Sequence, residues 1–163
     1  MLSVVAEELE VAAWRSLLLA QNAALRAIEA QLTAAGHIPL TWYDVLLELN
    51  AAPGRRLRIQ ELASRVVLSR TRVSRLVDEL ARAGLVCREP DPADGRGSFA
   101  VLTDAGRSRL RAAAPAYLQG IREHFARHLT RDELRTLRTA LDKVTAAHQP
   151  PIPPPSVHAA KAT

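Results

Sequence analysis

The residues best suited to chemistry form a dense group of guanidinium and hydroxyl side chains near the middle of the chain. They lie at the start of a predicted helix, and they are Ser69, Arg70, Thr71, Arg72, Ser74 and Arg75. The guanidinium fork matches the O6 and N7 acceptors of guanine, and serine or threonine can reach a base or a phosphate. Because the N-terminal residues of a recognition helix contact base edges, this group predicts hydrogen bonding to a nucleic acid.

The positive charge of the chain is concentrated around this group. Residues 55–88 contain nine arginines and three acidic residues, a formal charge of +6, whereas residues 1–54 carry −4 and residues 89–163 carry +3. A basic stretch on a folded domain favours a polyanionic partner. Four further arginines suit contacts with flanking phosphates, and these are Arg55, Arg56, Arg58 and Arg65. The alternative is an ordinary solvated face, since arginine richness can reflect codon usage.

Composition predicts a helical protein without catalytic machinery. Of the 163 residues, 48% are apolar, 24% are charged and only 4% are aromatic, which disfavours a disordered chain and a β-sandwich. Because the sequence has no G-x-S-x-G, P-loop or H-E-x-x-H motif, we predict no enzyme activity, no cofactor and no metal site. It begins without a basic leader and has no apolar run of about 18 residues, so we expect a cytoplasmic protein with no membrane association.

Helices are expected on the N-terminal side of the group and within it. Apolar residues at helical spacing predict a helix over residues 4–35, ended by Gly36, and Thr41 is the expected N-cap of the next helix. Residues 59–66 form a short helix, and Ser69 caps the helix that carries the arginines. Two helices this close together predict a helix-turn-helix.

A β-hairpin and another helix are expected next. Residues 85–86 begin one strand and residues 98–102 form the other, with a turn rich in proline, aspartate and glycine between them. Thr103 then caps a helix that should reach about His128, with a kink or break at Pro115.

The C-terminal segment completes the order of elements. Thr130, with Glu133 three residues later, has the pattern of a capping box for the last helix. Residues 149–163 contain closely spaced prolines and are expected to form an extended, unpacked tail. The predicted fold is mainly α with a small β-hairpin wing, a winged helix-turn-helix domain flanked by N- and C-terminal helices.

The sequence resembles the MarR family of winged helix-turn-helix transcriptional regulators. The resemblance begins at Leu62-Ala63, continues over residues 69–86 and is strongest in DGRGSFAVLT at residues 94–103, which has the family's D-x-R-x5-L-T pattern. It extends over about residues 5–147. The resemblance implies dimerisation helices within residues 1–35 and 104–148 and a DNA-binding region over residues 36–103, with residues 149–163 as a flexible tail.

Two residues of the predicted hairpin acquire roles from the resemblance. Arg96 matches the family's wing-tip arginine, which enters the minor groove, and a narrow groove attracts arginine through its negative potential. Asp94 matches the acid that holds this arginine in place, and the alternative for Asp94 is an ordinary turn residue.

The resemblance also implies a binding place for a small-molecule effector. In the family, small ligands bind between the DNA-binding lobe and the dimer helices. The candidates to border such a pocket are Trp14, His37, Trp42 and Tyr43. Aromatic residues at helical positions are more commonly core residues, so both interpretations stay open for them.

Three other residues are interpreted as structural. Cys87 is expected to be a small, semi-buried strand residue. His124 and His128 share a spacing that a metal can use, but no cluster of acids or cysteines accompanies them. We expect both histidines at an interface or on the surface.

Together these features predict a sequence-specific transcriptional repressor that binds double-stranded DNA as a homodimer. A two-fold dimer implies a palindromic operator. The family resemblance implies in addition that an effector would weaken DNA binding by shifting the spacing of the two DNA-reading heads. Two alternatives stay open: a sequence-independent architectural DNA-binding protein, and a protein-interaction module on a winged-helix fold.

Overall fold

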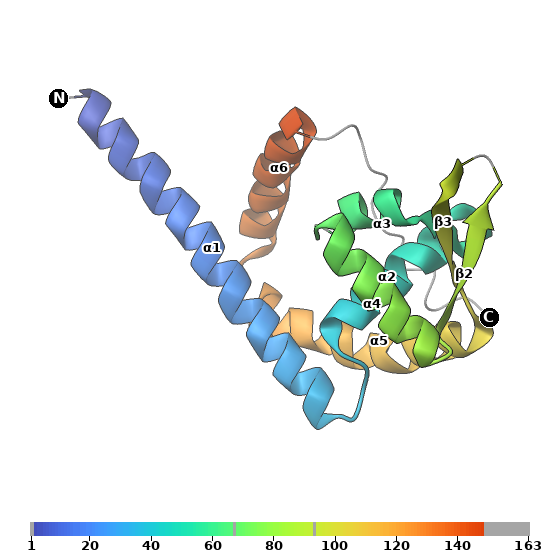
Figure 1. Cartoon of the computed structure of the whole chain (residues 1–163). Coiled ribbons are helices and arrows are strands. Elements are labelled where there is room, and N and C mark those ends of the chain that lie inside the picture. Colours follow the sequence, from blue (N-terminus) through green and yellow to red (C-terminus); the bar gives the residue numbers. More distant parts are fainter. Residues whose placement is uncertain (1, 67, 93, 149–163) are drawn as a thin grey trace.

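The computed structural model consists of a compact part from which two helices extend (Figure 1). It describes residues 2–66, 68–92 and 94–148, with the side chains of residues 2–7, 70 and 94–96 excepted. The helices are α1 (Leu2–Ala34), α2 (Leu40–Ala51), α3 (Ile59–Arg65), α4 (Arg70–Arg82), α5 (Asp104–His124) and α6 (Arg131–His148). The strands are β1 (Arg56–Arg58), β2 (Val86–Asp91) and β3 (Asp94–Leu102), and single 3-10 turns span Pro53–Arg55 and Ala126–His128.

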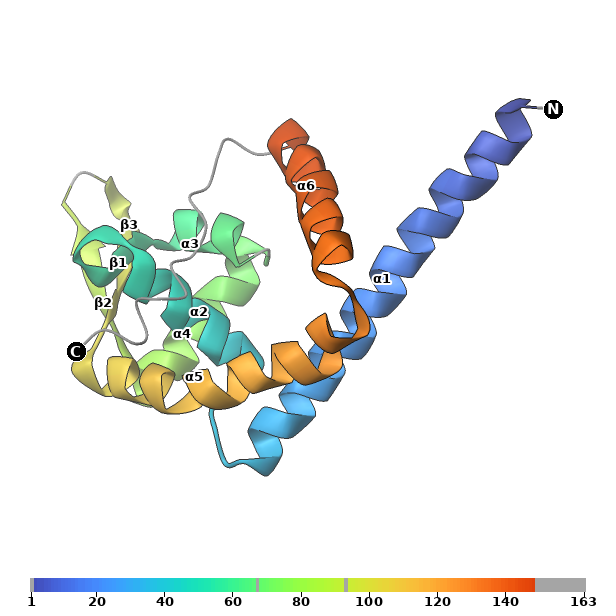
Figure 2. The same ribbon diagram turned by 180° about the vertical axis from the view of Figure 1, so that it is seen from behind.

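Helix α5 joins the compact part to the extended helices. Seen from either side, α5 runs from the sheet along the base of the compact part to α1 (Figures 1 and 2). The N-terminal half of α1 projects away from the rest of the chain, and α6 stands between this half and the compact part. The mainly α winged helix-turn-helix fold with flanking helices is therefore confirmed.

The hydrophobic core lies where α2, α3, α4 and α5 meet the sheet. Its fully buried side chains come from every one of these helices, and the largest are Leu46, Leu49, Leu62, Leu80, Leu110, Val45, Val73 and Val77. The core extends to α1 through Leu32, which is also fully buried. This packing fixes the position of α4 within the fold, because a close-packed interior resists even small displacements.

The sheet contains one strand that the sequence analysis did not predict. Its order is β1-β3-β2, and both pairings are antiparallel, with Leu57 opposite Ala100 and Arg88 opposite Ala100 on the other side. Strand β1 has only three residues, so it is too short for an alternating pattern to reveal it. It converts the predicted hairpin into a three-stranded wing.

The predicted start of the second helix was wrong. Helix α2 begins at Leu40 with Pro39 as its N-cap residue, and Thr41 makes no cap. The side chain of Glu29 in α1 replaces the cap, because its carboxylate accepts a 2.7 Å hydrogen bond from the Leu40 N–H. An acidic group at a helix N-terminus also complements the helix dipole. A long-range cap of this kind leaves no local sequence signal.

Other predicted helix ends are confirmed. The Ser69 hydroxyl accepts from the Arg72 N–H, and the Thr103 hydroxyl accepts from the Gly106 N–H. Thr130 and Glu133 form the reciprocal hydrogen bonds of a capping box. Gly36 has a φ of +69°, as expected for a residue that ends a helix.

The end of the fifth helix differs from the prediction. Helix α5 continues through Pro115 without a break and ends at His124, where Phe125 leaves the helical conformation with a φ of −136°. His128 lies in the 3-10 turn that follows, so His124 and His128 do not share a face of one helix.

Gly106 packs against the backbone at the start of α5, and replacing it should destabilise the fold. A Cβ atom at this position would lie 2.1 Å from the Leu85 carbonyl oxygen and 2.8 Å from the Leu102 side chain. We expect Gly106→Ala to lower the free energy of unfolding by about 2–3 kcal/mol, measured by urea denaturation. Gly120→Ala is the control, because its nearest neighbours are side-chain atoms of Gln31 and Ile28 at 3.2 Å or more, with no backbone atom among them. Equal stability of the two variants would contradict this prediction.

Candidate nucleic-acid interface

Helix α4 presents an apolar face to the core and a polar face to solvent. Val73, Val77 and Leu80 are buried, whereas Thr71, Arg72 and Arg75 are exposed. The Ser69 cap holds the first turn, so the positive end of the helix dipole lies beside the exposed arginines. This half of α4 can therefore donate hydrogen bonds to an anionic or hydrogen-bonding surface.

Three of the predicted contact residues lie outside the described side chains. These are Arg70 in α4 and Asp94 and Arg96 in the wing. Their assignments stay predictions.

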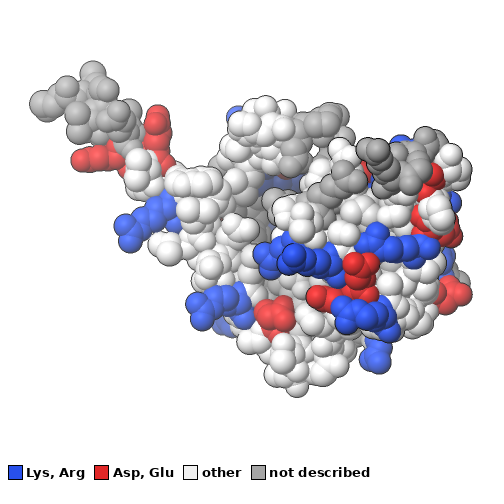
Figure 3. Space-filling view, viewed as in Figure 1, with Lys and Arg blue, Asp and Glu red and all other residues white. Residues whose placement is uncertain are grey.

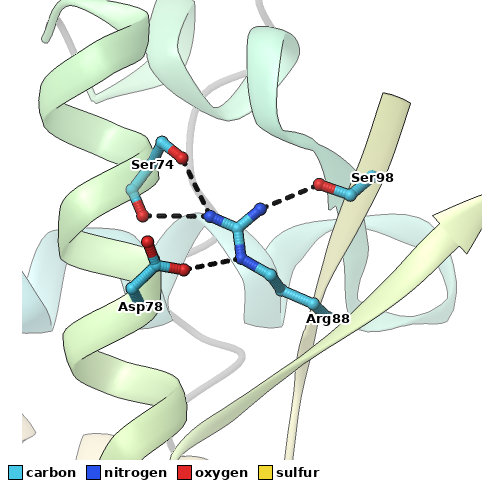
Figure 4. Close-up of polar contacts among 4 residues, drawn as sticks. All are labelled: Ser74, Asp78, Arg88 and Ser98. Atoms are coloured by element: carbon cyan, nitrogen blue, oxygen red, sulfur yellow. Dashed lines mark hydrogen bonds and ion pairs between the residues drawn. The ribbon is translucent and has the colours of Figure 1, made fainter. Parts of the chain in front are cut away.

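Ser74 has a different environment from its neighbours on α4. Its hydroxyl oxygen accepts a 2.9 Å hydrogen bond from Arg88 Nη2, and its carbonyl oxygen accepts a second from the same atom at 3.0 Å (Figure 4). Arg88 was not among the predicted site residues. The sequence carries a signal for it only in the opposite charges of Arg88 and Asp78, which lie ten residues apart.

The arginines of β1 and its flanks are exposed in part and paired with acids. Arg56 lies 3.2 Å from Glu89 and stacks over the Phe99 ring at 4.0 Å. Arg58 Nε donates a 2.6 Å hydrogen bond to the buried Asp91, while its own side chain is 55% exposed.

Arg55 lies at the other end of this edge. Its side chain is 3.8 Å from that of Asp104, which is fully open to solvent. The side chains of Arg55, Arg56 and Arg58 are therefore partly exposed at the edge of the wing.

Arg65 does not fit the predicted phosphate contact. Its side chain is only 16% exposed, and it donates a 2.6 Å hydrogen bond to Glu61 and lies 3.8 Å from Glu48. Both acids belong to the compact part of the fold, so Arg65 is an internal partner. We exclude it from the candidate phosphate contacts.

The charged side chains on this face are mixed. Figure 3 shows Lys and Arg side chains spread over the region of α4 and the sheet, with acidic side chains between them. Part of the basic surface is therefore compensated by neighbouring acids.

A second feature is a cleft of about 930 Å³ between α1, α2 and the segment that leads into α4. None of the four residues predicted to border a pocket lines it. Trp14 is 61% exposed on the projecting half of α1, and Tyr43 is buried with its ring 4.3 Å from that of Tyr117. The residues that do line the cleft are Gln21, Leu25, Arg26, Glu29, Ala30, Leu40, Thr41, Asp44, Leu47, Glu48, Arg65, Val66, Leu68 and Tyr117.

The cleft combines apolar side chains with an acidic wall. Burial, reinforced by the neighbouring charges of Glu48 and Glu29, raises the pKa of Asp44 to about 6. Burial also raises the pKa of Glu48, although Arg65 opposes that shift. The pKa of Tyr117 is raised to about 12, mainly by burial, so this phenol stays protonated at neutral pH. The cleft therefore offers hydrogen-bond donors, acceptors and apolar surface together.

The remaining candidates have clear surroundings. Cys87 is exposed, so its prediction as a semi-buried residue was wrong. His124 Nε2 lies 3.1 Å from the Gln31 side-chain oxygen, and this contact joins α5 to α1. Among the side chains that the structure describes, no group of three or more metal-ligating residues occurs. Among the described helices, none has the length and hydropathy needed to cross a membrane.

The raised pKa of Asp44 makes the stability of the fold depend on pH. Since the folded state holds this proton more tightly than the unfolded chain does, stability should fall as pH rises from about 4 through about 6. We expect Asp44→Asn to flatten this decline and to add roughly 1–2 kcal/mol to the free energy of unfolding at neutral pH. Urea denaturation across this range measures the effect. Asp142→Asn, at an exposed site, is the control, and a gain for Asp44→Asn that is independent of pH would contradict the raised pKa.

Comparison with known proteins gives consistent matches. Residues 38–97 match the sequence model described as "MarR family". The HTH-type transcriptional regulator YkoM of Bacillus subtilis is 35% identical over 98 residues, which are 60% of this chain and 62% of YkoM. The match thus spans less than two thirds of that relative's length.

Two solved structures from Streptomyces coelicolor are similar over most of their length. Sco3205, a MarR family transcriptional regulator whose structure is in complex with DNA, is 35% identical with a TM-score of 0.77, over 86% of this chain and 92% of that one. AbsC, another MarR family transcriptional regulator, is 32% identical with a TM-score of 0.75, over 85% and 93% of the two chains.

Proposed function

Because this chain belongs to the MarR family, we propose that it is a transcriptional regulator that binds a specific DNA sequence through α4. The observation that carries this proposal is the exposed N-terminal half of α4, where Thr71, Arg72 and Arg75 point away from the core next to the wing. The N-terminal residues of a recognition helix are the ones that reach base edges in the major groove. The structure of Sco3205 in complex with DNA supports the same class of partner.

The other arginines of the interface have positioning roles. Arg55, Arg56 and Arg58 lie at or beside β1 with partly exposed side chains, which suits contacts with phosphates flanking the major groove. Arg96, by the family resemblance, enters the adjacent minor groove. Base contacts from α4 then specify sequence, while the phosphate contacts fix the register of the protein on the duplex.

The active form is a homodimer. Val11, Trp14, Leu18 and Leu25 follow one another at spacings of three, four and seven residues, so they share one face of α1, and all four are more than 40% exposed. Within the same chain α5 covers this face at Ile28, which is buried. A second copy of the chain covers the exposed part. Two-fold symmetry then places two α4 helices on half-sites about 34–36 Å apart in a palindromic operator.

A small-molecule effector binds in the cleft between α1, α2 and the segment leading into α4. Val66 and Leu68 line the cleft and come just before the Ser69 cap, so a ligand there bears directly on the start of α4. The dimer can adopt different spacings of its two α4 helices. A ligand that binds better to one spacing than to another shifts the population toward the spacing it prefers. The protein acts as a repressor that such a ligand releases.

Selection from random duplex DNA at physiological salt tests this function. Enrichment of a palindromic sequence, bound in the presence of excess competitor, is the expected result. Enrichment of no sequence together with a steep salt dependence would identify an architectural DNA-binding protein instead. No binding even at low salt would leave the protein-interaction alternative.

Arg75 is expected to contact a base of the selected operator. Arg75→Ala should then weaken binding to that operator by about 1–3 kcal/mol and relax the preference at one position, measured by titration of operator variants. Arg82→Ala is the control, because Arg82 is an exposed arginine in the last turn of the same helix. A uniform loss on all sequences would make Arg75 a phosphate contact.

The apolar face of α1 is expected to hold the dimer together. Leu18→Glu places a charge in the proposed interface and should yield a monomer, read from the molar mass by light scattering after size-exclusion chromatography. Ala13→Glu adds the same charge on another face of α1 and should leave the dimer intact. A dimeric Leu18→Glu variant would argue against this interface.

A further inference from the structure

Arg88 connects the proposed recognition helix to both long strands of the wing. From its position on β2, its Nε donates a 2.8 Å hydrogen bond to Asp78 Oδ1, and its Nη2 donates to the Ser74 hydroxyl at 2.9 Å. Its Nη1 donates a 2.9 Å hydrogen bond to the Ser98 hydroxyl on β3. Figure 4 shows the guanidinium lying between α4 and β3, with partners on both sides.

The hydrogen bonds of Arg88 leave little of its donor capacity for another ligand. A guanidinium has five N–H donors, and with the bond to the Ser74 carbonyl oxygen, Arg88 uses four of them within the protein. The planar fork fixes the directions of these bonds, so Arg88 holds its partners in one relative orientation. A lysine at the same place carries one compact charge and cannot hold all three partners in this geometry.

The location of Asp78 also supports a positioning function for Arg88. It is an acid on the helix proposed to face DNA, and its side chain is 55% exposed. A carboxylate near phosphates opposes DNA binding electrostatically. Asp78 should therefore lower the affinity for DNA unless it has another function within the protein. Its described partner is the Arg88 guanidinium at 2.8 Å.

We propose that Arg88 is a positioning residue that sets the orientation of the wing relative to α4 through Asp78, Ser74 and Ser98. The inference rests on the proposed DNA-binding function and adds a residue that acts through the recognition helix rather than on DNA. The orientation matters because α4 and the wing read adjacent grooves of one duplex. It also gives the Ser74 oxygen a partner within the protein, Arg88, while the Ser74 O–H can still donate, so its base contact stays a prediction.

The direction in which Asp78→Ala changes the affinity for DNA distinguishes the positioning function from a purely electrostatic effect. Asp78→Ala removes a negative charge from the DNA-facing helix, so electrostatics alone would tighten binding. We expect the opposite, binding to the selected operator about fivefold to tenfold weaker than that of the unmodified protein, because the orientation is lost. Glu79→Ala is the matched control, since it removes the same charge from the next residue. The described part of the chain contains no side-chain partner for Glu79.

The arginine itself gives an independent measurement. Arg88→Lys keeps the positive charge, so a phosphate contact would largely survive it, whereas the hydrogen bonds to three partners would not. We expect Arg88→Lys to weaken operator binding by about fivefold to tenfold and to leave the salt dependence of binding unchanged. In a double-mutant cycle, Arg88→Ala and Asp78→Ala should be strongly non-additive.

Titrations of full-length variants on the selected operator and on a scrambled duplex decide the outcome, with thermal denaturation to confirm folding. Tighter or unchanged binding by Asp78→Ala, like that of Glu79→Ala, overturns the inference. Should Asp78→Ala fail to fold, Arg88→Lys decides, and binding equal to that of the unmodified protein overturns it. A loss of about one unit of salt slope in Arg88→Ala makes Arg88 a phosphate contact and also overturns it. Failure of the unmodified protein to select any operator refutes the proposed function instead.

Discussion

The interface depends on a narrow apolar stripe on α4. Val73, Val77 and Leu80 are fully buried, and they anchor a helix whose other residues are mostly charged or hydroxylated. Because this stripe is the part of α4 that enters the core, it determines which side chains face outwards. Arg72 and Arg75 are exposed since positions adjacent to a buried stripe on a helix turn away from it. The core thus orients the proposed reading surface without contributing any atom to it.

Three hydrogen bonds of Thr103 connect the turn after α4 to β3 and α5. The Thr103 hydroxyl donates to the Gly84 carbonyl oxygen and accepts from the Gly106 N–H, while the Thr103 N–H donates to the Leu85 carbonyl oxygen. The end of β3 and the start of α5 are thereby fixed to the turn that follows α4. Since α5 packs along α1, the proposed reading surface and the proposed dimer surface belong to one connected framework.

The sequence predicts the parts of this framework that rest on local chemistry. Caps at Ser69, Thr103 and Thr130 act within three residues, so their patterns are visible in the sequence and the structure confirms them. Contacts between distant segments leave no such pattern. The Glu29 cap on α2 and the Arg88 network join residues at least ten positions apart, and neither was predicted. None of the four residues predicted to border a pocket lines the cleft, because its lining depends on side-chain directions that residue type alone does not give.

The cleft contains a partly buried acid, Asp44, close to the other acids Glu29 and Glu48. Glu29 serves two purposes there, since its carboxylate caps α2 and also adds to the negative surroundings of Asp44. Glu48 has Arg65 as a counter-charge, whereas the raised pKa of Asp44 reflects burial beside other acids. A ligand that hydrogen-bonds to Asp44 would relieve a cost that the free protein carries. Leu40, at the α1–α2 connection, and Leu68, in the segment entering α4, line the same cleft. A ligand bound there would therefore affect both segments together. The unfavourable burial of Asp44 and the proposed response of the reading surface to a ligand would then have a single structural origin.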